Sequence, residues 1–64
     1  MSKEEFVKEL KDKGLNAGYS NDGIPTVFVG TVNDISQANG KVKEAIKELG
    51  YIESYGIALE NKQN

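Results

Sequence analysis

The chain has 64 residues, of which ten are Asp or Glu and eight are Lys, giving a formal net charge of −2 with 38% hydrophobic residues. It has no Cys and no His, which excludes a disulfide framework and the zinc and iron–sulfur sites that depend on those side chains. A chain this short forms one small domain and buries only about 60% of the surface that its unfolded form exposes.

The first predicted element is a helix over residues 3–13. Ser2 and Glu5 have the spacing of a capping box, in which each side chain accepts from the other residue's backbone N–H. Gly14 is placed to end the helix in a left-handed conformation. The apolar side chains recur at helical spacing, and two i,i+4 pairs have the favourable orientation. These residues are Phe6, Val7 and Leu10, and the pairs are Glu4 with Lys8 and Glu9 with Lys13.

A hairpin is predicted next, with strands at about residues 15–20 and 24–30. The intervening Asn21-Asp22-Gly23 is a strong turn signal because Asp-Gly readily supplies a positive φ. The second strand is apolar on both faces, which is typical of a central strand. Pro25 has no N–H for the ladder, so we expect it near the start of that strand.

Two interpretations compete for residues 31–49. In the first, a long helix begins near Asp34, with Asp34 and Gln37 as its cap, and carries a continuous apolar stripe. In the second, residues 31–40 form a loop and a short helix covers about 41–49, because a glycine inside a helix is unfavourable by about 1 kcal/mol relative to Ala. We favour the long helix, and Gly50 ends it in either case. The stripe comprises Ile35, Ala38, Val42, Ala45, Ile46 and Leu49.

A third strand is predicted over residues 51–59, with Tyr51, Glu53, Tyr55, Ile57 and Leu59 on one face. Residues 1–60 are thus expected to form one α+β domain with a frayed tail at 61–64. The order α-β-β-α-β predicts two layers, in which two helices pack on one face of a three-stranded mixed sheet. The right-handed crossover makes the third strand parallel to the second or to the first.

Residues 42–51, Val-Lys-Glu-Ala-Ile-Lys-Glu-Leu-Gly-Tyr, resemble the closing helix and turn of heavy-metal-associated domains, the small copper-chaperone family. The hairpin, this helix and the last strand are similar to the final elements of that ferredoxin-like βαββαβ fold. The family's first strand and its metal loop with two cysteines have no counterpart here. The resemblance therefore implies a truncated ferredoxin-like shape without metal, and argues against copper or zinc transport.

Several kinds of chemistry find little support in the sequence. Triad catalysis needs a base beside the nucleophile, and the glycines lack the spacing of a phosphate-binding loop. A small enzyme with an interfacial carboxylate site, drawn from Asp22, Asp34 and Glu53, is one alternative, although these residues also suit a turn, a helix cap and a solvated position. We expect no enzymatic activity and no cofactor.

Nucleic-acid binding is a second alternative. Lys41, Lys43 and Lys47 would form a weak basic patch on the helix layer together with Lys8 and Lys11. Neighbouring carboxylates dilute that patch, the strands carry no Lys or Arg, and the chain is net acidic. Nucleic acid is therefore an unlikely partner.

The remaining prediction is a protein-interaction module, with a second copy or another protein as the partner. Two helices cover only one face of a sheet, so apolar side chains on the other face, or on a free edge strand, are available to a partner. The residues expected to carry the interaction are Tyr19, Phe28, Tyr55 and Ile57. The polar, charged N-terminal residues do not fit a secretory signal, so we expect a cytoplasmic protein without a membrane segment.

Overall fold

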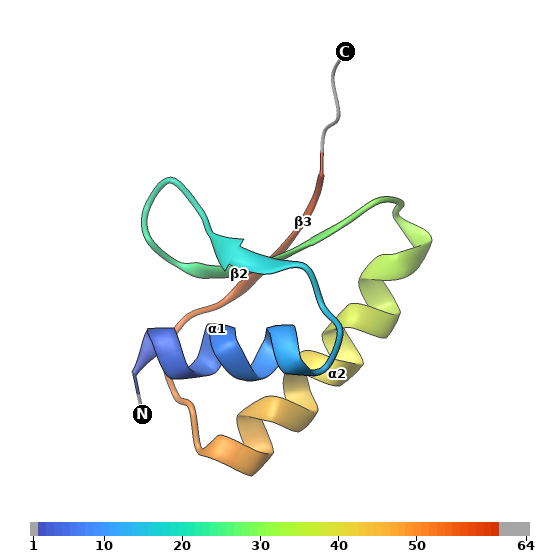
Figure 1. The fold of residues 1–64 in the computed structure, drawn as a ribbon. Coiled ribbons are helices and arrows are strands. Elements are labelled where there is room, and N and C mark those ends of the chain that lie inside the picture. The colour runs from blue at the N-terminus through green and yellow to red at the C-terminus, as the bar shows by residue number, and fades with distance from the viewer. Residues whose placement is uncertain (1, 61–64) are drawn as a thin grey trace.

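Two helices and a three-stranded mixed sheet make up the fold of this computed structural model, which describes residues 2–60. The sheet has the order β1-β2-β3, with β1 antiparallel and β3 parallel to the central β2. Both helices lie on the same side of the strands (Figure 1). The predicted two-layer α-β-β-α-β architecture is confirmed, while the predicted tail at 61–64 lies outside the described residues. The elements are α1 (Lys3–Asp12), β1 (Ala17–Tyr19), β2 (Pro25–Val29), α2 (Asn33–Leu49) and β3 (Gly56–Leu59).

The ends of α1 follow the sequence signals closely. The Glu5 N–H donates to Ser2 Oγ and the Ser2 N–H donates to Glu5 Oε1, each over 3.1 Å, so the predicted capping box is present. At the other end Gly14 has a φ of +89°, and the Leu15 N–H donates to the Leu10 carbonyl, as expected for a glycine-terminated helix.

The ion pairs of α1 are predicted only in part. Lys13 Nζ lies 3.9 Å from a Glu9 carboxylate oxygen, as the i,i+4 spacing predicts, and 3.1 Å from Glu48 on α2. The bond to Glu48 raises the pKa of Lys13 and joins the two helices at the surface. Among the described side chains, Glu4 and Lys8 form no ion pair.

The hairpin is confirmed, with strands shorter than predicted. Gly23 adopts a φ of +77° in the turn, where the Ser20 hydroxyl accepts from two backbone N–H groups, those of Asp22 and Ile24. Pro25 is the first residue of β2 and lies opposite Tyr19, so its missing donor falls at the strand's start.

The long-helix interpretation of α2 is correct, but the proposed cap is wrong. The backbone is already helical at Val32, and no side chain within residues 2–60 caps the helix. A tight turn begins the helix, because the Asp34 N–H donates to the Thr31 carbonyl and the Thr31 hydroxyl donates to Asp34 Oδ2. Asp34 therefore lies within the first turn, where a negative charge favours the helix dipole, and Gly50 ends the helix at a φ of +69°.

Gly40 lies in the middle of α2, and we expect Gly40→Ala to stabilise the domain by about 1 kcal/mol. A Cβ at this exposed position would meet no atom within 4 Å, and its φ is not in the left-handed region. Urea unfolding of the variant and the wild-type protein measures the difference. No gain in stability would contradict the regular helical backbone through this residue.

The predicted strand over residues 51–59 is wrong in its first half, since β3 covers only Gly56–Leu59. Tyr51 is instead buried in the core, where its ring stacks on Phe6 with centroids 3.9 Å apart and planes 3° from parallel. The Tyr51 hydroxyl donates to the Ser54 carbonyl over 2.8 Å, which closes a loop. Ile52 points outward and is 92% exposed, so an alternating strand does not form here.

We expect Tyr51 to make the fold sensitive to alkaline pH. Burial raises the pKa of its hydroxyl above the ordinary 10.0, and the negative charges of Glu53 and ionised Tyr19 add to the rise. The pKa of Tyr51 is higher in the folded chain than in the unfolded one, so the protonated hydroxyl contributes to the free energy of unfolding. This stabilising contribution is complete below pH 10.0 and is lost as pH rises through the folded pKa. Denaturant unfolding between about pH 8 and 11 checks this, since Tyr51→Phe loses less stability than the wild-type chain over that range.

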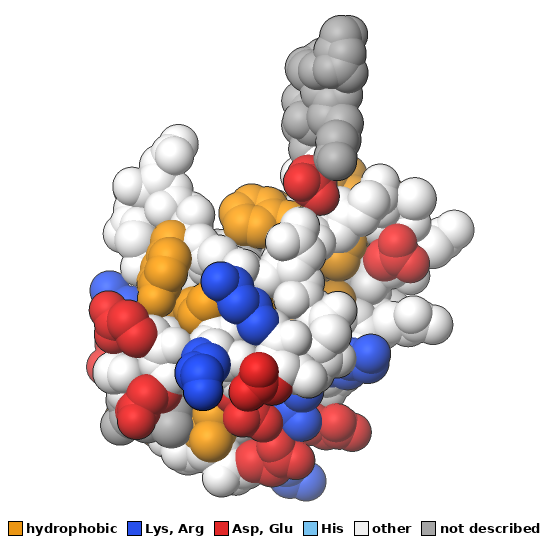
Figure 2. All heavy atoms as spheres, in the orientation of Figure 1, with side chains coloured by type: hydrophobic (Ala, Val, Ile, Leu, Met, Phe, Trp, Pro, Cys, Tyr) orange, Lys and Arg blue, Asp and Glu red, His pale blue; other side chains and the backbone are white. Residues whose placement is uncertain are grey.

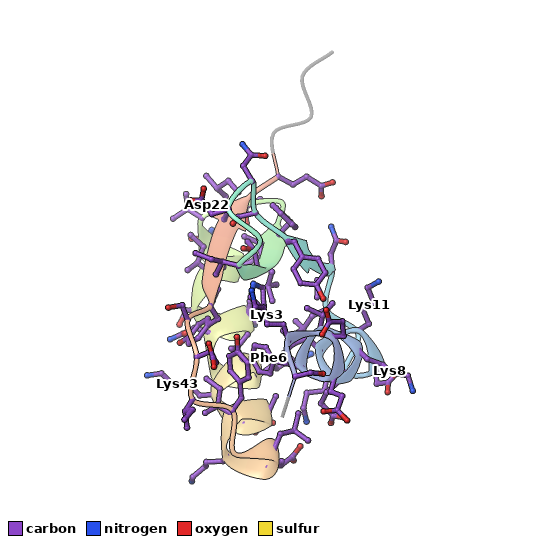
Figure 3. All side chains as sticks on the ribbon, turned by 90° about the vertical axis from the view of Figure 1, so that its left-hand side faces the viewer. Lys3, Phe6, Lys8, Lys11, Asp22 and Lys43 are labelled. Atoms are coloured by element: carbon purple, nitrogen blue, oxygen red, sulfur yellow. The ribbon has the colours of Figure 1, made fainter. Side chains whose placement is uncertain are left out.

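The core lies between the helices and one face of the sheet. Figure 3 shows Phe6 pointing into this interior while Lys8 and Lys11 point away from it. All three elements of the predicted apolar pattern contribute, since the first helix, the hairpin and the α2 stripe each supply buried side chains. Among the described residues, the buried apolar ones are Phe6, Val7, Leu10, Ala17, Pro25, Val27, Ala38, Val42, Ala45 and Tyr51.

Candidate interaction surface

The outer edge of β3 is the most accessible hydrogen-bonding edge of the described sheet. The Glu60 N–H donates to the Val29 carbonyl over 2.7 Å, so the backbone of Glu60 faces β2. Backbone groups alternate in direction along an extended strand, which turns the N–H and C=O of Ile57 and Leu59 away from β2. Since β3 pairs only with β2 among the described strands, these groups face outward at a free edge.

The edge of β1 is less suited to pairing. This strand has only three residues. The N–H of Ala17, which faces away from β2 by the same alternation, already donates to the Leu15 carbonyl over 3.1 Å. The free edge of β3 is therefore the place where a further strand can pair.

An apolar groove runs beside that edge, between β3 and the first half of α2. It has a volume of about 540 Å³, and none of the described residues that line it is charged. Val32, which lines the groove at the start of α2, is 66% exposed, and Leu59, at the end of β3, is 48% exposed. We call this surface, the outer edge of β3 with its groove, the β3-edge surface. The groove is lined by Val32, Ile35, Ser36, Asn39, Tyr55, Gly56 and Ile57.

Tyr55 fixes the shape of this groove. Its hydroxyl donates to Asn39 Oδ1 over 3.0 Å, which ties the start of β3 to the middle of α2. Ile57 is half-buried and packs against the core from the same side of the strand. The two residues predicted from the third strand, Tyr55 and Ile57, therefore lie close together, and both line the groove.

The other two predicted residues lie elsewhere. The register pairs Ala17 with Val27 and Val27 with Ile57, so these three side chains share the helix-covered face. Tyr19 shares that face but lies on β1, at the opposite edge from β3, where it is 43% exposed. Phe28 alternates to the open face, so the four predicted residues form no single surface.

The open face of the sheet is small and carries few large side chains. Phe28 is half-buried, and a Cβ at Gly18 would lie 3.5 Å from its ring. On the same face, toward β3, a Cβ at Gly56 would lie 3.7 Å from Thr26 Oγ1. Phe28 thus lies over a glycine of the neighbouring strand rather than projecting toward a partner. Figure 2 shows charged side chains gathered over the helices and exposed hydrophobic side chains near the strands.

The α2 side of the groove was missed by the sequence interpretation. Val32 lies three residues before Ile35, a member of the predicted apolar stripe, and Asn39 lies four residues after it, and this helical spacing is the signal that locates them.

The lysines do not form the patch that nucleic-acid binding would need. At 100° per residue, Lys41 and Lys43 lie nearly opposite each other around α2, whereas Lys43 and Lys47 share a side with Glu44. Lys41 lies by a separate hollow of about 270 Å³ that also includes Asp34. In Figure 3, Lys43 lies on the opposite side of the molecule from Lys8 and Lys11.

We accordingly expect weak or no binding to polyanions. A titration with heparin or single-stranded DNA at about 50 mM salt, followed by fluorescence anisotropy, should give no saturable signal. A signal that weakens with salt, and that Lys43→Glu with Lys47→Glu removes, would restore the nucleic-acid alternative.

The three carboxylates of the enzyme alternative are not brought together as a group. Asp34 begins α2 and Glu53 follows its end, and a helix of 17 residues is roughly 25 Å long. Asp22 lies in the hairpin turn (Figure 3). Within residues 2–60, no three Asp or Glu side chains are grouped so as to hold a metal ion.

Comparisons of the chain with protein-family models, with curated proteins and with solved structures give no match in any of the three. The resemblance to heavy-metal-associated domains therefore stays a prediction. None of the described helices is both long and apolar enough to cross a membrane.

Proposed function

We propose that this chain is a non-enzymatic, cytoplasmic protein-interaction module that pairs an extended segment of its partner with the free edge of β3. The observation that carries the proposal is the coincidence of that edge with the uncharged groove against α2. The proposal narrows the predicted site to Tyr55 and Ile57, since Tyr19 and Phe28 lie on other surfaces.

Strand addition uses both parts of the β3-edge surface. The outward N–H and C=O groups of Ile57 and Leu59 supply main-chain hydrogen bonds, and the groove receives alternate side chains of the added strand. Because the groove lining is uncharged and partly apolar, it favours aliphatic or aromatic side chains over charged ones.

A selection of displayed random peptides on the immobilised wild-type chain tests this proposal. We expect enrichment of extended peptides with apolar residues at alternate positions, and a loss of affinity of about tenfold or more on Ile57→Ser. Tyr55→Ala should also weaken binding, because it removes the bond to Asn39 that shapes the groove.

Tyr19→Ala is the matched control, since it removes an exposed tyrosine from the opposite edge of the sheet. Circular dichroism of each variant establishes that the fold is retained. A selection without enrichment on a chain that is monomeric under the selection conditions, or binding that Tyr19→Ala weakens as much as Tyr55→Ala, would contradict the proposed site.

A further inference from the structure

We infer that the segment added to β3 is the β3 strand of a second copy of this chain, paired antiparallel about a two-fold axis at Ala58. This inference rests on the proposed function and names the partner of the same surface. The result is a continuous six-stranded sheet in which the two β3 strands are central.

The backbone of β3 is complementary to itself in this register. Ile57 and Leu59 carry the outward N–H and C=O groups, and they flank Ala58, whose own groups face β2. With the axis at Ala58, Ile57 of one copy lies opposite Leu59 of the other, and the two residues exchange both hydrogen bonds. The two Ala58 residues then form the closely spaced non-hydrogen-bonded pair, where a small side chain fits best.

The side chains of β3 add apolar contacts in the same register. A two-fold axis normal to the sheet keeps each face on its own side, so Ile57 and Leu59 of both copies form one apolar row on the helix-covered face. The groove beside each β3 opens on this same side, which brings the two α2 helices together over the new strand pair. The exposed Val32 and half-buried Ile35 thereby gain apolar neighbours.

The absence of charge on the β3-edge surface also favours a second copy as the partner. A two-fold axis places the same surface on both sides of the interface, so a surface with charge of one sign would meet like charge across it. β3 and the groove lining carry no charge, in a chain of which 28% is charged. The groove thus has no charged group to orient a foreign segment, whereas symmetry orients a copy.

The edge of β3 has only four residues but lacks the other features that keep monomers apart. Besides being short, natural edge strands are protected by lysines, prolines, bulges or a covering element. Gly56-Ile57-Ala58-Leu59 contains no charged residue and no proline, and its outer side has no partner among the described strands. An unprotected edge with apolar flanks is expected when the edge is occupied in solution.

Light scattering over about 10 µM to 1 mM, with Leu59→Pro and Leu59→Ala compared, tests this inference. We expect the wild-type chain to approach about 14 kDa, twice the 7.0 kDa of one chain, as concentration rises. Leu59→Pro removes an outward N–H without touching the β2 ladder, and Leu59→Ala loses the same side chain but keeps the N–H. The dissociation constant should be about 30-fold larger for Leu59→Pro than for Leu59→Ala, because each dimer loses two hydrogen bonds.

Amide hydrogen exchange gives a second readout that needs no variant. On going from the lowest to the highest concentration, the N–H groups of Ile57 and Leu59 should become protected, while that of Ala58 is protected throughout. Unchanged exchange at Ile57 and Leu59 in a dimer would overturn the β3 pairing, as would equal dimerisation of the proline and alanine variants.

A wild-type chain that stays near 7.0 kDa at every concentration would overturn the second copy as partner. The peptide selection then separates the two proposals. Peptides that bind the monomer at Ile57 would retain the proposed function with a foreign partner, and the absence of such peptides would overturn both.

Discussion

Replacing Phe6 with alanine is expected to leave most of the chain unfolded at 25 °C. The Phe6 side chain is completely buried, and its ring stacks on Tyr51 at 3.9 Å between centroids. Removing a buried Phe side chain from a protein core is unfavourable by about 3–5 kcal/mol. The hydrophobic core of a domain this small supplies about the same amount in total, so the folded state has little margin left. Circular dichroism with a urea titration measures the loss directly.

Tyr51→Phe is the control for this prediction. It keeps the ring that stacks on Phe6 and removes only the hydroxyl that donates to the Ser54 carbonyl. Its expected effect is about 1 kcal/mol, the usual net contribution of one hydrogen bond. If Phe6→Ala were no more destabilising than Tyr51→Phe, the stacked pair would not be part of the core.

The sequence predicted the parts of the fold that local signals determine. The Ser2–Glu5 box, Gly14 and Gly50 act through backbone conformations within a few residues of themselves, so their effect is visible without any tertiary contact. The doubly apolar pattern of residues 24–29 correctly placed β2 at the centre of the sheet. The start of α2 was predicted less well, because a turn formed by Thr31 and Asp34 replaces the expected cap.

Residues 51–55 show where local pattern fails. Tyr51 and Tyr55 stand at alternate positions, as in a strand, yet Tyr51 stacks on Phe6, a residue 45 positions away in the chain, and takes no place on the sheet. Nothing in the spacing indicates that contact. The loop that follows exposes Ile52 and delays β3 until Gly56.

The sequence also identified only some of the residues of the candidate surface. Tyr55 and Ile57 were predicted to share one side of the last strand, and both line the groove, although Tyr55 lies just before β3. The α2 wall was missed because it depends on which side of α2 faces β3. Tyr19 and Phe28 were grouped with them on residue type alone, and the sheet register separates them.

Leu10→Ala is expected to destabilise the domain by about 2–5 kcal/mol, the second-largest effect predicted here. Leu10 is 1% exposed, and together with Phe6 and Val7 it forms the apolar side of α1 that covers the sheet. An isolated helix of ten residues is marginal in water, so α1 persists only while this side is docked. Urea unfolding of Leu10→Ala, with the exposed Lys11→Ala as a matched control on the same helix, measures the cost of weakening the docking.

The same variant tests whether α1 unfolds alone or with the sheet. Three of the ten buried apolar residues among residues 2–60 belong to α1, so its release exposes the core side of Val27 and leaves the sheet without cover. We therefore expect one cooperative transition, with Leu10→Ala accelerating amide exchange in α1 and β2 by the same factor. The Leu10 carbonyl still accepts from the Lys13 and Leu15 N–H groups in the variant, so the end of the helix is not altered directly. Faster exchange confined to α1 would show that the helix detaches from a sheet that remains folded with α2 alone.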